Sequence, residues 1–449
     1  MARNDMTRGV HAPKIATRFV GTKSEELVKR SLMCLPSKHR HRLVISSARG
    51  ATLTDVDGNT YLNFNDTTNP LGSGHPNILR ALERQMKSLV HISGATALYE
   101  PYVELAETLK SHVLGRSVRI VYCTTGTEAC DLAINLTRWY TQKPIILSYL
   151  GSYHGKTGTT LGATTVRSSL RKHIKPLISE VLYLPYPYCY RCPLNQSYPE
   201  CDILCLKSID EIFERAVPPE EVAAVLFEPI QIHGGVVVPP DEYFPALEEM
   251  CERQEVMTID DEVYTGFCKS GKFFAVEHWG IAPDILCMGK GMGGGMPIAA
   301  VSAEKKIVDS CELVHRGSFG SFAGHPLSCV AALENIRVLK QEKFAEKALR
   351  QGDYIKKILS EFSGKSKLVG DVRGKGLLIG VELVKDKKMK TPAAEEAGRV
   401  VERAMQEGLL IGREGRYGHV LKLSPPLTIT SEETDRALRI LEAVLKKSQ

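Results

Sequence analysis

Lys290 is the residue whose setting points most directly to chemistry. It lies in DILCMGKGMGGGMPIAAV (residues 284–301), between two apolar runs and among five glycines at positions 289–295. Because its neighbours are small, we expect the amine to face a cavity and to be partly desolvated. Desolvation lowers the pKa of an amine and makes it a nucleophile toward carbonyl carbon. The segment therefore predicts a lysine that forms a Schiff base.

A group of acids ends another apolar run. TIDDEVYTG (residues 258–266) places Asp260, Asp261 and Glu262 at the end of a predicted buried strand. A carboxylate there is costly unless a cation meets it. One interpretation is a structural ion pair or a helix cap. The other is an acid that pairs with a protonated heterocyclic nitrogen of a cofactor.

A third segment, YCTTGTEA (residues 122–129), runs from a strand through Gly126 into the start of a helix. Free backbone N–H groups and the positive end of a helix dipole suit a phosphate. A threonine-capped helix after a tight turn is the alternative. GFCKSGKF (residues 266–273) is not a Walker phosphate loop, because Phe273 stands where a magnesium-binding hydroxyl is required.

These three features belong to one kind of site. A phosphate seat, an acid for a ring nitrogen and a carbonyl-reactive lysine together describe the binding of pyridoxal phosphate. Open α/β sheets bind ligands beyond the carboxyl ends of their strands, where all three segments are predicted to lie.

The elements that position these residues follow from hydrophobic periodicity. TLTDVDGNTYLNF predicts a hairpin over 52–64, and helical spacing is found over 127–140 and 241–254. Short apolar runs predict strands at 118–123, 144–149, 222–229, 256–260, 284–288 and 298–301. Alternating strands and helices indicate an α/β fold, with a mostly parallel sheet covered on both faces.

The last third of the chain has a different pattern. From about residue 330 it is helical, and then come a strand at 376–383, a helix near 393–407, a strand pair around 409–423 and a final helix from Ser431. This order predicts a smaller α+β domain.

Composition excludes several classes of protein. The chain has 449 residues, 43% hydrophobic and 24% charged, and its net charge of +6 is spread thinly, so nucleic acid is not an expected partner. No apolar run approaches the ~20 residues that span a bilayer, and no apolar signal core follows the N-terminus. We expect no membrane association and a cytoplasmic location, with an organellar transit peptide in the basic first fifty residues as the alternative.

Four of the twelve cysteines lie close together, in YCYRCPLNQSYPECDILC. Cys189, Cys192, Cys201 and Cys205 form two close pairs that are compatible with free thiols, two disulfides or a structural zinc ion. The sequence leaves these states open, although each favours a structural role. No metal is assigned to the catalytic site.

The motifs resemble those of the class III (subgroup II, fold type I) pyridoxal-phosphate aminotransferases, the family of 4-aminobutyrate and ω-amino acid aminotransferases. The resemblance runs along nearly the whole chain through ARGATLTDVDGNTYLNF, LGSGHP, TTGTEA, SYHGKTG, EPIQ, DEVYTGFCKSGKFFA, PDILCMGKGMGGGMPIAAV, GSFGSFAGHPLSC, VRGKGLLIGVEL and LSPPLTIT. It implies a large cofactor-binding domain over residues 76–330, with a cysteine-containing excursion at 186–206. A small domain would combine residues 1–75 with residues 331–449.

The resemblance also implies roles for matching positions. Lys290 would carry the Schiff base and shuttle a proton, and Asp261 would pair with the pyridine N–H. Further cofactor contacts would be the Gly126 and Thr127 N–H groups, the stacking Tyr153 with His154 beside it, Glu228 in the floor, and Tyr264. Ser321 would reach the phosphate of the partner subunit, which implies a homodimer with shared active sites, with a tetramer as the alternative. Gln231 would lie behind these residues.

Three positions depart from the family pattern. Tyr264 replaces a glutamine near the cofactor's 3′-oxygen, and a phenol can donate the same hydrogen bond. His233 stands where many members carry a glutamate, and Lys422 stands where many carry the arginine that binds a substrate carboxylate. Since lysine cannot offer a bidentate fork, the substrate carboxylate would meet Lys422 as a simpler anchor or bind near Arg413 or Arg416.

The function expected from this resemblance is amino transfer from an ω-amino acid, amine or amino acid to a 2-oxo acid, by a ping-pong mechanism. Racemases or epimerases, phospho-lyases and decarboxylating dialkylglycine enzymes share the fold and form the alternative. A non-catalytic protein that binds pyridoxal 5′-phosphate is a remote third possibility. The donor and the acceptor are left open.

Overall fold

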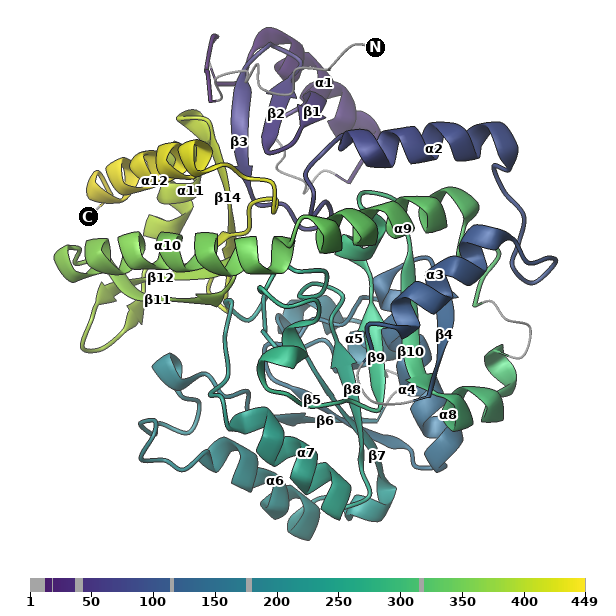
Figure 1. Ribbon diagram of the computed structural model, residues 1–449. Coiled ribbons are helices and arrows are strands. Elements are labelled where there is room, and N and C mark those ends of the chain that lie inside the picture. Colours follow the sequence, from purple (N-terminus) through teal and green to yellow (C-terminus); the bar gives the residue numbers. More distant parts are fainter. Residues whose placement is uncertain are drawn as a thin grey trace.

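The computed structural model describes residues 13–17, 19–36, 43–113, 117–174, 180–314 and 319–448. The first twelve residues of the predicted N-terminal segment and the last residue of the C-terminal segment lie outside this part of the chain. Two β-sheets organise the described residues, one in the lower half of Figure 1 and one at its upper left. Within the described ranges, no helix is both long and apolar enough to cross a bilayer.

The first sheet has seven strands. In spatial order they are β4 (Val118–Cys123), β10 (Ala299–Glu304), β9 (Ile285–Met288), β8 (Met257–Asp261), β7 (Val222–Phe227), β5 (Ile145–Tyr149) and β6 (Val181–Leu184). Strand β10 is antiparallel to both of its neighbours, and every other neighbouring pair is parallel. Six carboxyl ends therefore meet at one edge, which is where an open sheet binds ligands. The mostly parallel sheet predicted from the apolar runs is confirmed.

Both faces of this sheet are buried, which explains why its strands are apolar runs rather than alternating ones. All six residues of β7 are buried. Successive residues point to opposite faces, so Leu226 packs in one apolar cluster with α4 (Gly126–Thr141) and Phe227 in the other with α7 (Tyr243–Arg253). The sheet is thus enclosed between helices, as the alternating pattern predicted.

The second sheet joins the two ends of the chain. Its order is β1 (Ile45–Arg49), β2 (Thr52–Asp55), β3 (Thr60–Phe64), β14 (Leu409–Glu414), β15 (Val420–Leu423), β12 (Leu378–Asp386) and β11 (Val369–Lys375), and β13 (Thr391–Pro392) pairs with β12. The pairing of β3 with β14 is parallel, and the other pairings are antiparallel. In Figure 1 the purple N-terminal strands stand beside the yellow-green C-terminal ones. This confirms a smaller α+β unit built from both terminal segments, and the exact limits at residues 75 and 330 stay a prediction.

The predicted hairpin over 52–64 is present as β2 and β3. Its turn is held by the Asp55 carboxylate, whose Oδ1 accepts the N–H groups of Asp57 at 2.9 Å and of Asn59 at 2.8 Å. Gly58 adopts φ = +89°, a conformation that costs glycine little. The turn therefore forms where the Asp-Gly-Asn signal placed it.

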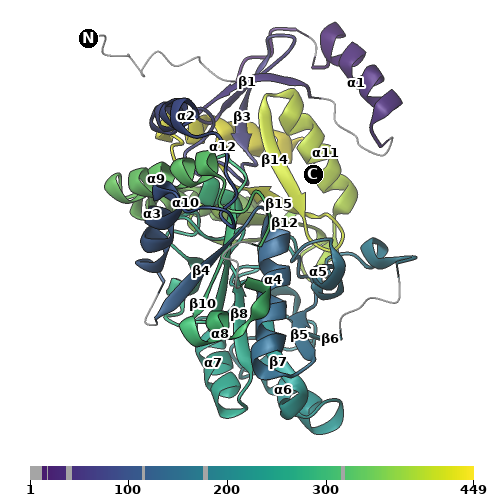
Figure 2. The ribbon, with the colours of Figure 1, turned by 90° about the vertical axis from the view of Figure 1, so that its right-hand side faces the viewer.

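Helices fill the space around and between the sheets. Helix α9 (Pro326–Gln341) packs against α2 (Pro76–Ser88) and α3 (Glu100–Lys110), and α10 (Phe344–Lys365) continues from it onto β11 of the second sheet. Figure 2 shows the same arrangement from the side, with α4 along the first sheet. The remaining helices are α1 (Thr22–Cys34), α5 (Gly158–Ala163), α6 (Leu204–Arg215), α8 (Lys305–Ser310), α11 (Ala394–Gln406) and α12 (Ser431–Lys446).

Candidate active site

A cavity of about 620 Å³, partly open to solvent, lies at the carboxyl edge of the seven-stranded sheet. Segments that follow five parallel strands reach it, since β4, β5, β7, β8 and β9 each end there. Its walls are Thr125, Gly126, Thr127, Cys130, Tyr153, His154, Glu228, His233, Asp261, Val263, Tyr264 and Lys290. Eight residues of the predicted cofactor site, and His233 of the predicted substrate site, are thus brought into one cavity.

Lys290 follows β9 after a single glycine, Gly289. Its backbone has φ = +38°, an unusual conformation for a residue with a side chain, and such strain is concentrated at functional sites. Its Nζ lies 4.6 Å from the centroid of the Tyr264 ring, and within the described ranges no hydrogen bond or ion pair engages it. Burial lowers the pKa of Lys290, although the nearby Asp261 carboxylate opposes this. The side chain therefore places an unpaired amine in the cavity.

Asp261 ends β8, the parallel neighbour of β9. Its Oδ2 lies 2.7 Å from Nδ1 of His154 and accepts from the thiol of Cys130 at 3.3 Å, and its Oδ1 accepts the Val263 N–H at 3.1 Å. Burial alone would raise the pKa of Asp261, but the hydrogen bond and positive charge of His154 hold it below its ordinary value. Burial likewise opposes the charge on His154, yet Asp261 raises the pKa of His154 to about 10. Asp261 is therefore kept ionised without contact with solvent.

The start of α4 forms a seat for an anion. Thr125 caps the helix by accepting the Glu128 N–H at 3.3 Å, and the Glu128 carboxylate accepts the Thr125 N–H at 2.9 Å. The first-turn N–H groups of Gly126 and Thr127 have no acceptor inside the helix. A Cβ on Gly126 would lie 2.4 Å from Cγ1 of Val263, so only glycine fits this close approach.

The opposite wall is built on Glu228 and Tyr153. Oε1 of Glu228 accepts the Tyr153 N–H at 2.9 Å, which fixes the loop that follows β5. Burial raises the pKa of Glu228 to about 7, although the charge on His154 opposes this. The ring of Tyr153 lies 4.7 Å from that of His233, with an interplanar angle of 60°.

The far end of the site carries a charged cluster. Lys422 is buried and donates to Oε1 of Glu414 at 2.9 Å, and the Glu414 Oε2 lies 3.0 Å from Nδ1 of His233. The Lys422 Nζ also lies 5.2 Å from the centroid of Tyr264, whose hydroxyl is buried and has no hydrogen-bond partner within the described part of the chain. Burial would raise the pKa of Glu414, but His233 and Lys422 lower it, so a carboxylate already occupies the predicted anion anchor.

Three predicted positions lie apart from this cavity. Ser321 is exposed on the loop before α9, and Arg416 is exposed over the ring of Tyr417 at 5.2 Å. Gln231 is buried behind the wall, where its side chain donates to the Leu150 carbonyl at 3.1 Å. The contact of Ser321 with a partner subunit and that of Arg416 with substrate stay predictions.

Cys130 and Glu414 are among the residues of the site that were not found from the sequence. Nothing in the sequence marks Cys130 as a site residue except its position one helical turn after Gly126. Glu414 is placed only by the register of the folded sheet: Gly412 pairs with Lys422 across the antiparallel strands, and side chains alternate along a strand. Glu414 therefore faces the same side as Lys422, and Arg413 faces away, where it is exposed and donates to the Ala394 carbonyl at 3.3 Å.

The donor set fits pyridoxal 5′-phosphate. The close approach at Gly126 and the N–H groups of the first turn of α4 fit a phosphate. The ionised Asp261 fits a protonated ring nitrogen. The unpaired Tyr264 hydroxyl offers a donor for a ring oxygen, and the Lys290 amine is positioned for an aldehyde. These groups follow different strands, so only the folded sheet brings them together in one site.

The Aminotransferase class-III family model matches residues 35–445. The chain belongs to the class-III aminotransferases. It is 35% identical to the leucine/methionine racemase of Thermococcus litoralis, over 94% of this chain and 96% of that protein. It is 33% identical to the 4-aminobutyrate aminotransferase of Escherichia coli, over 93% of this chain and 97% of that protein. An amine transaminase from an uncultivated Pseudomonas species, solved with PLP bound, superimposes with a TM-score of 0.83 at 28% identity, covering 93% and 97% of the two chains.

Class-III aminotransferases depend on pyridoxal 5′-phosphate and move an amino group from a donor to a 2-oxo acid. The predicted family, fold type, enzyme class and cofactor of this class-III aminotransferase are therefore confirmed.

Proposed function

We propose that this class-III aminotransferase takes nitrogen from an ω-amino acid, an amine or an amino acid and passes it to a 2-oxo acid in two half-reactions at the same cavity. The observation that carries the proposal is the pair formed by Lys290 and Asp261. They follow neighbouring parallel strands, one with an unpaired amine and the other with a carboxylate held ionised. Together they match the two ends of one substituted pyridine ring.

The residues have separable tasks. Bound pyridoxal phosphate supplies an aldehyde that condenses with amines and an electron-poor ring that makes an adjacent C–H bond acidic. Asp261 would hold a proton on the ring nitrogen, and His154 would keep that carboxylate charged. Gly126 and Thr127 would bind the phosphate through backbone N–H groups.

Lys290 would act first as the covalent anchor and then as the general base that moves the proton. A general base is most efficient when its pKa is near the working pH, and burial shifts the pKa of Lys290 in that direction. Tyr153 would cover one face of the ring, and Glu228 would hold Tyr153 in place through its backbone N–H.

The substrate's carboxylate, where it has one, would meet Lys422. In the unliganded arrangement Glu414 neutralises this lysine. Binding of an anion there requires Glu414 to yield, whereas an amine without a carboxylate leaves the ion pair in place. The cluster would therefore admit both charged and neutral donors.

Racemisation or epimerisation of an amino acid is the second candidate. It is favoured by the similarity to the leucine/methionine racemase of Thermococcus litoralis and to the alanine/serine racemase of Pyrococcus horikoshii, which is 33% identical over 97% of this chain. No arginine lines the described walls of the cavity, so the bidentate contact that an arginine would offer the carboxylate of a second, 2-oxo acid substrate is missing there.

One experiment tests both candidates. Purified holoenzyme is mixed with single amines and amino acids, without any 2-oxo acid, and the visible absorption of the bound aldehyde is followed together with the oxo product and the enantiomer ratio. An aminotransferase bleaches and stays bleached until a 2-oxo acid is added. A racemase keeps its absorption and accumulates the opposite enantiomer, and absence of both responses with every donor contradicts the proposal.

We further propose a homodimer with shared active sites. Leu98 and Phe322 leave 71% and 58% of their surface exposed, a costly arrangement for a monomer. Their segments lie together, since His91 stacks on Phe322 at 4.6 Å, and Ser321 is on the same loop. Light scattering of wild type and of Phe322→Asp tests this, because a monomeric variant that keeps full activity would contradict shared sites.

A further inference from the structure

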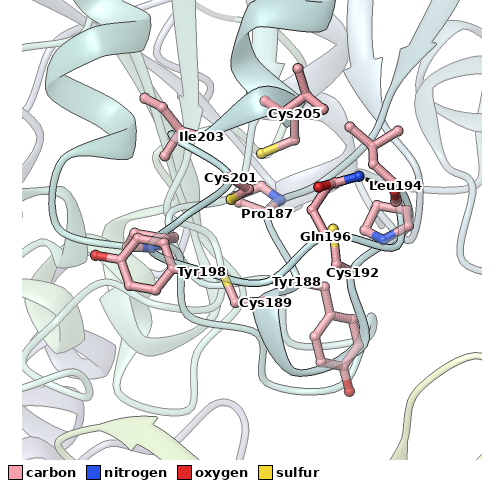
Figure 3. Close-up of a pocket in the computed structure, with 13 residues that line it drawn as sticks. Pro187, Tyr188, Cys189, Cys192, Leu194, Gln196, Tyr198, Cys201, Ile203 and Cys205 are labelled. Carbon is pink, nitrogen blue, oxygen red and sulfur yellow. Dashed lines mark hydrogen bonds between the residues drawn. The ribbon is translucent and has the colours of Figure 1, made fainter.

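The cysteine-containing excursion at residues 186–206 forms a pocket of its own, which shares no lining residue with the cofactor cavity. Cys189, Cys192, Cys201 and Cys205 all line it (Figure 3), and all four thiols are free. The other walls are Pro187, Tyr188, Pro193, Leu194, Gln196, Tyr198, Ile203, Leu204 and Pro240. Four sulfurs around one small pocket with no charged wall residue are a feature that the catalytic function does not explain.

Local turns present the cysteines as two pairs. Cys189 opens a 3-10 turn, Cys189–Arg191, so that Cys192 follows after one turn of chain. Cys201 precedes α6, its carbonyl accepts the Leu204 N–H at 3.1 Å, and Cys205 lies in the first turn of that helix. Separations of two and three residues within a pair are those of thiolate ligands that bind one metal ion.

The chemistry of the pocket favours a cation. No lysine, arginine or histidine lines the pocket, so no cationic side chain of its walls stabilises the four sulfurs as thiolates. A soft divalent metal ion would do so, and each thiol would then release its proton to solvent.

We propose that Cys189, Cys192, Cys201 and Cys205 form a structural binding site for one zinc-like metal ion. No three of the four sulfurs lie within 4.8 Å of one another in this structure. Binding must therefore contract the pocket until each sulfur reaches the ~2.3 Å of a zinc–thiolate bond. The apolar pocket provides the space for this closure, and the site is independent of the proposed function.

The site has a structural consequence because its flanking residues reach the second sheet. Tyr188 donates a hydrogen bond to the buried Glu382 of β12, and Arg191 forms an ion pair with it at 2.6 Å. Glu382 also binds Arg373 at 2.9 Å, and Arg373 donates to the Gly235 carbonyl at 2.6 Å. A metal ion at the cysteines would fix the excursion that carries Tyr188 and Arg191, and so stabilise the contact between the two sheets.

Metal analysis of the full-length holoenzyme tests the site directly. We expect about one zinc ion per chain in protein purified without chelators, and about one Co²⁺ per chain after exchange, with the visible absorption of tetrahedral cobalt thiolate. The variant Cys192→Ser/Cys205→Ser should lose both signals, while the control Cys34→Ser, which changes an exposed cysteine elsewhere, should keep them. Chelation should lower the melting temperature of the wild type and leave that of the double variant unchanged.

Other outcomes overturn the proposal, and two of them need no variant. An intact mass about 4 Da below that of the reduced chain would mean two disulfides instead of a metal site. Four thiols that titrate freely in the folded protein, with no uptake of Zn²⁺ or Co²⁺, would mean that the pocket binds no metal. If Cys192→Ser/Cys205→Ser folds and still binds one Co²⁺ with thiolate absorption, the ligands have been wrongly assigned.

Discussion

Nδ1 of His154 lies 2.7 Å from Oδ2 of Asp261, and both side chains are shielded from water. This pair keeps a carboxylate charged in a place where burial alone would protonate it. The proposed electron-withdrawing role of the cofactor ring depends on that charge, so the pair has a measurable pH signature.

We expect His154→Asn to move the acidic limb of the kcat profile to higher pH. Asparagine keeps a hydrogen-bond donor but removes the positive charge that lowers the pKa of Asp261. Since activity requires the ionised carboxylate, a higher pKa means that activity is lost at a higher pH. The control His173→Asn, at an exposed position, should leave the profile unchanged, and an unshifted limb in His154→Asn would show that the charge is not needed.

Replacing the acid itself is expected to be more severe. Asp261→Ala should lower kcat by several orders of magnitude, because the ring nitrogen loses the partner that keeps it protonated. Cofactor content, measured in the same preparation, separates this loss from simple failure to bind. A loss of less than about tenfold in a fully loaded variant would contradict the role of Asp261.

We expect Lys290→Ala to abolish turnover while the protein still folds and holds the cofactor through its phosphate. The amine is the only candidate for the covalent anchor among the described walls of the cavity, so its removal takes away both that anchor and the proposed general base. Spectra should show that the absorption of the lysine-bound cofactor is absent. Lys272→Ala changes an exposed lysine as the control, and undiminished turnover in Lys290→Ala would falsify the assignment.

The phosphate seat can be tested by steric means. Gly126→Ala places a methyl group 2.4 Å from Cγ1 of Val263, and the displacement should weaken cofactor affinity by about 10–100-fold. Val263→Ala in the same chain should restore most of it, because it removes the obstructing methyl groups. Gly158→Ala is the matched control, since that glycine also begins a helix and has open space at its Cβ. Equilibrium dialysis of the apoenzyme provides the affinities, and a double variant as weak as the single one would refute this account.

Glu414→Gln should unmask the anion anchor. The change leaves the Lys422 ammonium without its carboxylate, so we expect KM for a carboxylate-bearing substrate to fall about tenfold, with little change for a neutral amine. Lys422→Met should have the opposite effect on the charged substrate. Glu395→Gln, on the surface of α11, is the control. Equal effects on charged and neutral substrates would place carboxylate recognition elsewhere.

Glu382→Gln should destabilise the fold by about 3–5 kcal/mol, because Arg373 and Arg191 lose their buried counter-charge. The pKa of Glu382 is lowered in the fold, where burial is outweighed by its hydrogen bonds and cations. The contribution of the ionised Glu382 to the free energy of unfolding is therefore complete above pH 4.5, the ordinary pKa of this group, and it is lost as the pH falls further. Urea unfolding at several pH values should show that the free energies of unfolding of wild type and variant become equal only in acid. Glu220→Gln is the surface control, and an equal gap at every pH would contradict the ionised state.

Several elements were predictable because local and tertiary requirements agree. The strands that end at Phe227, Asp261 and Met288 are buried on both faces, so they read as apolar runs bounded by polar or glycine-rich segments. The hairpin turn at Gly58 carries its own signal. Lys290 and Asp261 could be found because a charged group at the end of such a run is costly without a purpose.

The charged cluster beyond Tyr264 was harder to predict. Lys422 was identified as a departure from the family pattern, but its partner Glu414 was overlooked in favour of Arg413 and Arg416. Strand register decides the position of Glu414, because it turns Glu414 to the same side as Lys422 and Arg413 to the other, while Arg416 lies exposed in the turn after β14. Register depends on which strands pair, and that is a property of the whole sheet.

The sequence by itself determined the family, the fold type and the cofactor, and it singled out Lys290 and Asp261 for the roles proposed here, because these conclusions rest on motifs that are each encoded in a contiguous segment. Only the tertiary structure decided how the segments combine. It joined strands from residues 45–64 and 369–423 into one sheet, set Glu414 against Lys422, and gathered four cysteines around one pocket. The physical reason is range: periodicity and turns act over a few residues, whereas burial, charge pairing and pocket shape depend on residues that only the folded chain brings together.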